Sequence, residues 1–106
     1  MKLPNFTALI GEAPNQRRIE PTEARVRQAL TALAAAGHHG ITSLEVSSWA
    51  LRLGHYIWLL RTKYGVTIET VHEPHDIGGV QGSHARYRAL DRIEILNGSE
   101  PAARAA

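Results

Sequence analysis

Residues Gly40–Val46, with the sequence GITSLEV, contain the clearest structural signal in this chain of 106 residues. Thr42 is followed three positions later by Glu45, which is the spacing of a capping box. In that motif the threonine hydroxyl and the glutamate carboxylate each bond a backbone amide where a helix begins. Ile41, before the cap, and the last residue of the stretch have the spacing of a hydrophobic staple. The stretch therefore predicts a short helix over about residues 43–49.

Helical periodicity is present on both sides of this stretch. Upstream, apolar residues recur at helical spacing after Pro21, which is tolerated in a first helical turn, and Gly37 is placed to cap the end. This pattern predicts a helix over residues 22–36. Downstream, a helix is predicted from about Leu53 to Tyr64, because its apolar residues cluster on one side.

After these helices the periodicity changes from the helical value of about 3.6 to the strand value of about 2. Residues 66–73 alternate as a half-buried strand, a glycine-containing loop follows, and residues 85–89 alternate again. Two strands joined by such a loop predict a β-hairpin. Ile93 and Ile95 form a further apolar segment, which is either a third strand or a surface for a partner.

The composition predicts one small folded unit, because 106 residues with 43% hydrophobic residues can bury a core. The absence of cysteine excludes disulfides and cysteine-based zinc sites. We expect a flexible arm at residues 1–18, a domain at residues 19–96 and a disordered tail at residues 97–106. Without a long apolar stretch or the features of a signal peptide, the chain is expected to be cytoplasmic and to have no membrane segment.

Charge is distributed unevenly along the chain, although the net charge is only +2. Residues 21–65 carry five basic and two acidic side chains, a net charge of +3, whereas residues 66–96 carry three basic and five acidic ones, a net charge of −2. A polyanionic partner is therefore expected to contact the helical half.

The order of the elements resembles the winged helix-turn-helix, in the variant form found in phage, prophage and bacterial proteins. The resemblance implies an α+β fold in which a three-helix bundle precedes a C-terminal β-hairpin wing, with the third helix as the recognition helix. It covers about half of the chain and is carried by Gly40–Glu45, Arg52-Leu53, Ile57, Leu60-Arg61, Gly65–Thr70 and Arg86–Arg88.

This resemblance implies binding of double-stranded DNA, by a transcriptional regulator or by an accessory factor of a mobile element. The third helix would enter the major groove, the start of the second helix would face a phosphate, and the wing would contact the flanking backbone. The residues assigned to DNA contact on this basis are Ser43, Arg52, His55, Trp58, Arg61, Thr62, His84, Arg86 and Arg88.

The outer face of the third helix also fits a different function. Trp58 and Leu59 occupy positions where polar or basic side chains are expected in a DNA-binding helix. Because winged helices also bind proteins, this face could instead anchor a protein partner. A homodimer through Ile93 and Ile95 is a third interpretation.

The basic residues outside the helices have two interpretations as well. Arg86 and Arg88 could straddle a phosphate backbone, or they could pair with Glu69 and Glu73 across the hairpin. The pair Arg17-Arg18 could add phosphate contacts from the arm, or it could be solvated.

Neither metal binding nor catalysis is predicted. Residues His72–Asp76 and His84 include ligand types suited to zinc or nickel, but their spacing matches no helical ligand pair. The chain has no phosphate-binding glycine loop before a helix, no nucleophile elbow and no paired carboxylates in a suitable element. We therefore expect no cofactor and no enzymatic activity.

Overall fold

The computed structural model describes residues 5–46, 50 and 52–97. Within these residues the chain forms two α-helices, α1 (Ala24–Ala36) and α2 (Leu53–Thr62), and a short 3-10 helix, η1 (Gly37–His39). The strands of the same part of the chain are β1 (Thr7–Ile10), β2 (Arg17–Ile19), β3 (Ile41–Thr42), β4 (Ile68–Ile77), β5 (Val80–Ala89) and β6 (Ile93–Asn97).

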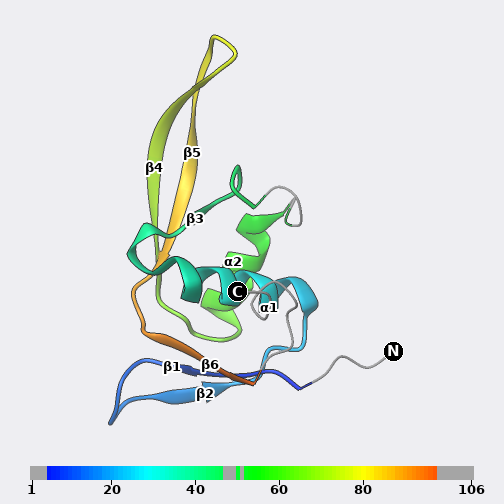
Figure 1. The fold of residues 1–106 in the computed structure, drawn as a ribbon, viewed down its shortest axis with the longest axis vertical. Helices are drawn as coiled ribbons and strands as arrows, with labels where there is room; N and C mark the ends of the chain where they lie inside the picture. Colours follow the sequence, from blue (N-terminus) through cyan, green and yellow to red (C-terminus); the bar gives the residue numbers. More distant parts are fainter. Residues whose placement is uncertain (1–4, 47–49, 51, 98–106) are drawn as a thin grey trace.

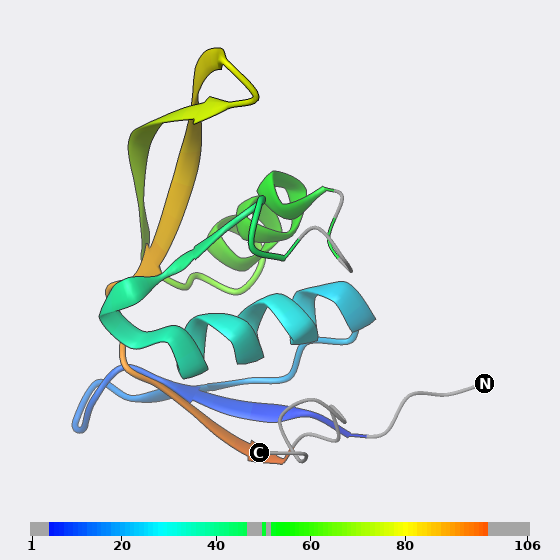
Figure 2. The ribbon, with the colours of Figure 1, turned by 45° about the horizontal axis from the view of Figure 1, so that its top comes forward.

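These elements are arranged in layers. A three-stranded sheet in the order β2-β1-β6 lies at one end, α1 packs on it, and α2 lies on the far side of α1 (Figure 2). A second sheet in the order β3-β5-β4 carries a long hairpin that projects away from the helices (Figure 1). Neither helix of the described residues has the length and apolar content needed to span a bilayer.

The helices form the centre of the hydrophobic core. The α1 pattern predicted from the sequence is confirmed, because Val26, Ala29, Leu30 and Leu33 are buried together. The helix ends at Gly37, whose φ of 56° suits glycine and whose amide bonds the carbonyl of Leu33. The buried face of α2 packs against α1 through Leu53, Ile57 and Leu60.

Residues 5–19 differ from the flexible arm that we predicted. Strand β1 lies between β2 and β6 and is antiparallel to both. Phe6, Ala8 and Ile10 are at most 2% exposed, and the guanidinium group of Arg27 lies 5.4 Å from the centre of the Phe6 ring. The apolar run Phe6–Ile10 is therefore part of the core and contains the central strand of this sheet.

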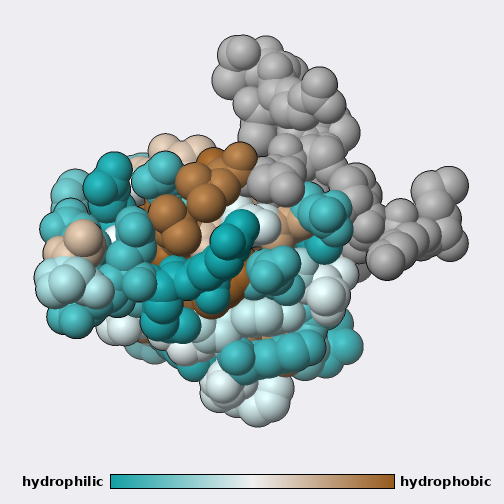
Figure 3. All heavy atoms as spheres, turned by 90° about the horizontal axis from the view of Figure 1, so that it is seen from below, coloured by the Kyte–Doolittle hydropathy of each residue, from teal (hydrophilic) through white to brown (hydrophobic). Residues whose placement is uncertain are grey.

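The partner of that run is the apolar segment at the other end of the chain. Ile95 and Ile93 of β6 pair with Ala8 and Ile10 of β1, and both isoleucines are half-buried against the core. This segment is thus a strand, as one of our two interpretations held. Seen from this end of the molecule, hydrophobic side chains gather in a patch among hydrophilic ones (Figure 3). Leu96 of β6 is 48% exposed.

The capping box forms as the sequence predicted. The Glu45 amide donates to Thr42 Oγ1 at 3.2 Å, and the Thr42 amide donates to Glu45 Oε1 at 3.0 Å. In the helix expected over residues 43–49, residues 43–46 form hydrogen-bonded turns, and residues 47–49 lie outside the described residues. A bundle of three α-helices is therefore not present in the described residues.

The wing is longer and more regular than we predicted. Strands β4 and β5 have ten residues each and are joined by the two-residue turn Gly78-Gly79. Both glycines have positive φ, 59° and 82°, which is the requirement of a type I′ hairpin turn. Ile41 of β3 pairs with Tyr87 of β5, so the capping-box segment is joined to the base of the wing.

Candidate functional site

The outward side of α2 is the surface on which the predicted residues come together. His55, Trp58, Arg61 and Thr62 are all exposed, on the side opposite the buried face of the helix. Trp58 is 56% exposed, and the His55 ring stacks on it with centroids 6.1 Å apart and planes 17° apart. Leu59, which we placed on this outer side, is half-buried and packs against the core.

This face has no acidic side chain. Residues 46–68 contain no aspartate or glutamate, whereas they contain Arg52, Arg61 and Lys63. None of the ion pairs among the described residues involves Arg52 or Arg61. A convex helix face without carboxylates is compatible with close approach to a polyanion.

The polar groups at the C-terminal end of this face are used within the protein. Arg61 donates from Nε and Nη2 to the carbonyl oxygen of Ile68, at 3.1 and 2.8 Å, and from Nη2 to Thr70 Oγ1 at 2.6 Å. Thr62 Oγ1 donates to the carbonyl oxygen of Trp58 at 2.8 Å. The bonds from Arg61 hold the last turn of α2 against the start of β4, a role that the sequence did not indicate.

The charge of Lys63 is offset by an ion pair with Glu23, the N-cap residue of α1. Its Nζ lies 2.8 Å from Glu23 Oε2, and the Tyr64 hydroxyl donates to Glu23 Oε1 at 2.6 Å. Burial alone would raise the pKa of Glu23, but the hydrogen bonds from Lys63 and Tyr64 outweigh it and lower the pKa to about 2 from an ordinary value of 4.5. This cluster joins the start of α1 to the end of α2.

The basic residues of the wing are also paired. Arg86 donates from Nε to Glu73 Oε2 at 2.7 Å, and its Nη1 lies 3.4 Å from Glu45 Oε1 and donates to the carbonyl oxygen of His39 at 3.1 Å. The hydrogen bond from Arg86 lowers the pKa of Glu73, so this carboxylate is ionised at neutral pH and offsets the guanidinium charge. Arg88 Nε lies 3.3 Å from Glu69 Oε1, a contact without hydrogen-bond geometry.

A chain of histidine contacts extends from this cluster toward the tip of the wing. His84 Nε2 lies 3.0 Å from Glu73 Oε1, and the Nδ1 atoms of His84 and His75 are 2.9 Å apart. The two rings are 12° from parallel with centroids 5.1 Å apart, so the Nδ1 atoms face each other directly. That geometry suits an N–H···N hydrogen bond and leaves no space for an ion between them; the described residues contain no cluster of three or more potential metal ligands.

The predicted site residues thus separate into three groups. Arg52, His55, Trp58, Arg61 and Thr62 follow one another along the outside of α2. Ser43 is exposed in the turn after β3, and the wing residues are His84, Arg86 and Arg88, which are half-buried among carboxylates and histidines. The ion pairs with Glu69 and Glu73 are those that our alternative interpretation of the wing described.

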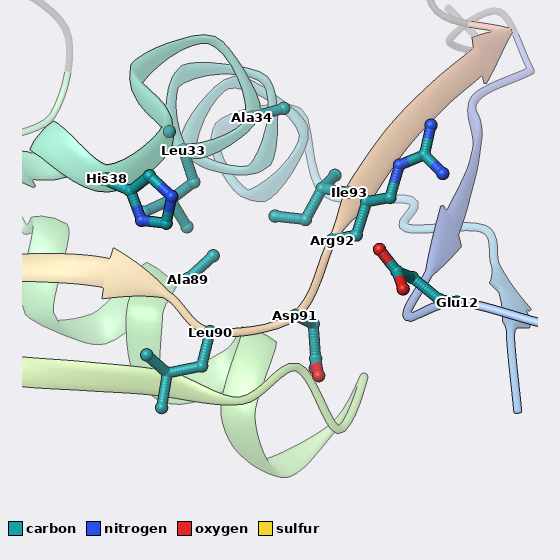
Figure 4. Close-up of a pocket in the computed structure, with 10 residues that line it drawn as sticks. Glu12, Leu33, Ala34, His38, Ala89, Leu90, Asp91, Arg92 and Ile93 are labelled. Atoms are coloured by element: carbon teal, nitrogen blue, oxygen red, sulfur yellow. The ribbon is translucent and has the colours of Figure 1, made fainter.

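A cavity between the helical layer and the base of the wing lies away from this surface. It has a volume of about 370 Å³ and lies between the end of α1 and the connection from β5 to β6 (Figure 4). Its apolar wall includes Leu33 and Ile93, and polar side chains such as His38 and Asp91 line the remainder. Asp91 Oδ2 accepts a bond of 2.8 Å from the Thr67 amide, which gives this carboxylate a structural role.

Comparison with known proteins gives one family. The model of the family described as "Winged helix domain" matches residues 21–99, which include α1, α2 and the whole wing. No curated protein and no solved structure matches this chain. The resemblance stated from the sequence is therefore confirmed at the level of the winged helix, without evidence for a phage origin.

Proposed function

The chain belongs to the winged helix domain family, whose fold is in general one of DNA-binding modules. We propose that it binds double-stranded DNA through the exposed face of α2. Winged helix domains are typically not enzymes. The observation that supports the proposal best is that residues 46–68, which include α2, contain no carboxylate. The outer side of α2 is exposed, and the hairpin projects beyond the helices (Figure 1).

In this proposal α2 enters the major groove. His55, Trp58 and Thr62 face the base edges, and Arg52, exposed at the start of the helix, contacts a phosphate. Arg61 contributes a positive charge while it remains bonded to β4. Ser43 lies exposed beside the capping box and is proposed to donate to the phosphate backbone.

The wing contributes less charge than its arginines suggest. Arg86 and Arg88 are each close to a glutamate, so their net attraction for phosphate is weakened unless DNA displaces the carboxylates. We propose that these residues and His84 lie beside the flanking backbone, and that their main effect is to hold the hairpin in position.

The biological setting follows from DNA binding. A small DNA-binding domain fits transcriptional control, or an accessory role in replication or excision of a mobile element. Either role would be carried out in the cytoplasm. The modest net charge of +3 over residues 21–65 predicts weak non-specific affinity for DNA. Tight binding would therefore require contacts with a preferred base sequence, or a dimer that doubles the charge.

The test is a titration of the full chain with random-sequence duplex DNA at about 50 mM and about 200 mM salt. Binding that weakens steeply between the two salt concentrations supports the proposal. No binding at the lower concentration removes it. Single-stranded DNA of the same composition is the control, because a winged helix in a major groove requires a duplex.

A protein-interaction function is the second candidate, and the exposed Trp58 favours it. Tryptophan and arginine are the residues that contribute most to protein interfaces, and Trp58 has Arg61 one helical turn away. If the chain fails to bind duplex DNA, this function becomes the better explanation of the same face.

A further inference from the structure

The hydrogen-bonding groups in the C-terminal half of the α2 face are occupied, and this limits what the face can recognise. Arg61 would bond a guanine in the usual bidentate manner through two of its nitrogens, but Nε and Nη2 are bonded to Ile68 and Thr70, so only Nη1 is left to donate. The Thr62 hydroxyl has given its only hydrogen to the carbonyl oxygen of Trp58.

The remaining feature at the middle of this face is the apolar ring of Trp58. It is 56% exposed and its plane is supported by the stacked ring of His55. Among the groups that base pairs present in the major groove, the C5-methyl group of thymine is the apolar one. A tryptophan ring has no acceptor and one donor, so it gains most from such a methyl group.

We propose that α2 selects thymine-containing sites by contact between the Trp58 ring and thymine methyl groups. This inference rests on the proposed binding of duplex DNA and adds to it the base that is recognised and the residue that recognises it. The specificity would come from van der Waals contact and from removal of water from the methyl group. The guanidinium group of Arg61 would keep its hydrogen bonds to β4.

The experiment removes the methyl group from the DNA and leaves the protein unchanged. Sequences that bind best are first selected from random duplex DNA, and each is then remade with deoxyuridine in place of thymidine. Base pairing and the pattern of donors and acceptors are the same in both. We expect enriched sequences to contain thymine, and replacement of the contacted thymine to weaken binding about four-fold, the value for one buried methyl-sized group.

The variant Trp58→Ala completes a double-mutant cycle with the methyl group. It should weaken binding to the thymidine duplex and should bind the thymidine and deoxyuridine duplexes equally. Leu90→Ala is the matched control, because Leu90 is a similarly exposed apolar residue, 61% exposed, outside α2. This control should keep the full preference for thymidine.

The outcomes separate this inference from the proposal on which it rests. Duplex binding that is indifferent to deoxyuridine at every position, or enriched sequences without thymine, would overturn the inference and leave DNA binding intact. A Trp58→Ala variant that still distinguishes the two duplexes would overturn it as well. Failure to bind any duplex at low salt would overturn both, and would leave a protein partner as the explanation of Trp58.

Discussion

Arg61 Nη2 donates to Thr70 Oγ1 at 2.6 Å, a hydrogen bond that joins the last turn of α2 to the start of the wing strand β4. The same guanidinium group also bonds the carbonyl oxygen of Ile68. Arg61, which the sequence assigned to DNA contact, therefore links α2 to the wing. Several consequences of this arrangement can be measured.

The variant Arg61→Ala should destabilise the fold. It removes the bonds to Ile68 and Thr70, and we expect the free energy of unfolding to fall by about 1 to 2 kcal/mol. Urea denaturation monitored by circular dichroism measures the change. Arg25→Ala is the control, because Arg25 is an exposed arginine whose side chain bonds Gln28 within the same helix, α1. An unchanged stability for Arg61→Ala would show that the residue has no structural role.

The variant Arg52→Ala should weaken binding to all duplexes by a similar factor. Arg52 is exposed and forms none of the ion pairs of the described residues, so we assign it to a phosphate. Loss of one phosphate contact reduces the slope of log affinity against log salt by about 1. Arg18→Ala, an exposed arginine on β2 at the other end of the molecule, should leave the slope unchanged.

The variant Glu73→Gln should strengthen DNA binding. It removes the carboxylate that offsets Arg86, so the wing becomes more positive at neutral pH. Arg86→Ala should have a smaller effect on affinity than Arg52→Ala, because its charge is already offset. The two affinities are measured at one salt concentration. If Glu73→Gln leaves affinity unchanged and Arg86→Ala abolishes it, Arg86 contacts phosphate directly and the pairing is lost in the complex.

Stability should fall with acidification as Glu23 is protonated. The pKa of Glu23 is about 2 in the folded chain and near 4.5 when its partners are absent, so the unfolded chain takes up the proton first. The contribution of this carboxylate is therefore complete above about pH 4.5 and is lost as the pH falls toward 2. Urea denaturation at a series of pH values should show a shallower acid dependence for Glu23→Gln. Equal slopes for the variant and the natural chain would contradict the role given to Lys63 and Tyr64.

Local sequence signals predicted the helices and the capping box well. The helical spacing of apolar residues located α1 and α2 to within a few residues, and the Thr42–Glu45 spacing predicted the two capping hydrogen bonds that the structure contains. These features depend on residues within one or two turns of each other, which is the range over which periodicity and capping act.

The pairing of strands that lie far apart in the chain could not be predicted from the sequence. The run Phe6–Ile10 and the segment around Ile93–Ile95 each had no evident partner, and the structure pairs them with each other across more than eighty positions. Strand β3 has only two residues, too short for a periodic signal. In the same way, nothing near Arg61 or Lys63 in the sequence indicated which carbonyl or carboxylate group would bond it, whereas the pairing of Arg86 with a glutamate across the hairpin was one of our two interpretations.

The most direct test of the central claim is amide chemical-shift mapping of the isotopically labelled chain during titration with duplex DNA. We predict that the shifts concentrate between Arg52 and Thr62, with smaller changes in β4 and β5 and none on the β2-β1-β6 sheet. Shifts confined to that sheet, or no shifts at low salt, would contradict the assignment of α2 as the DNA-binding surface.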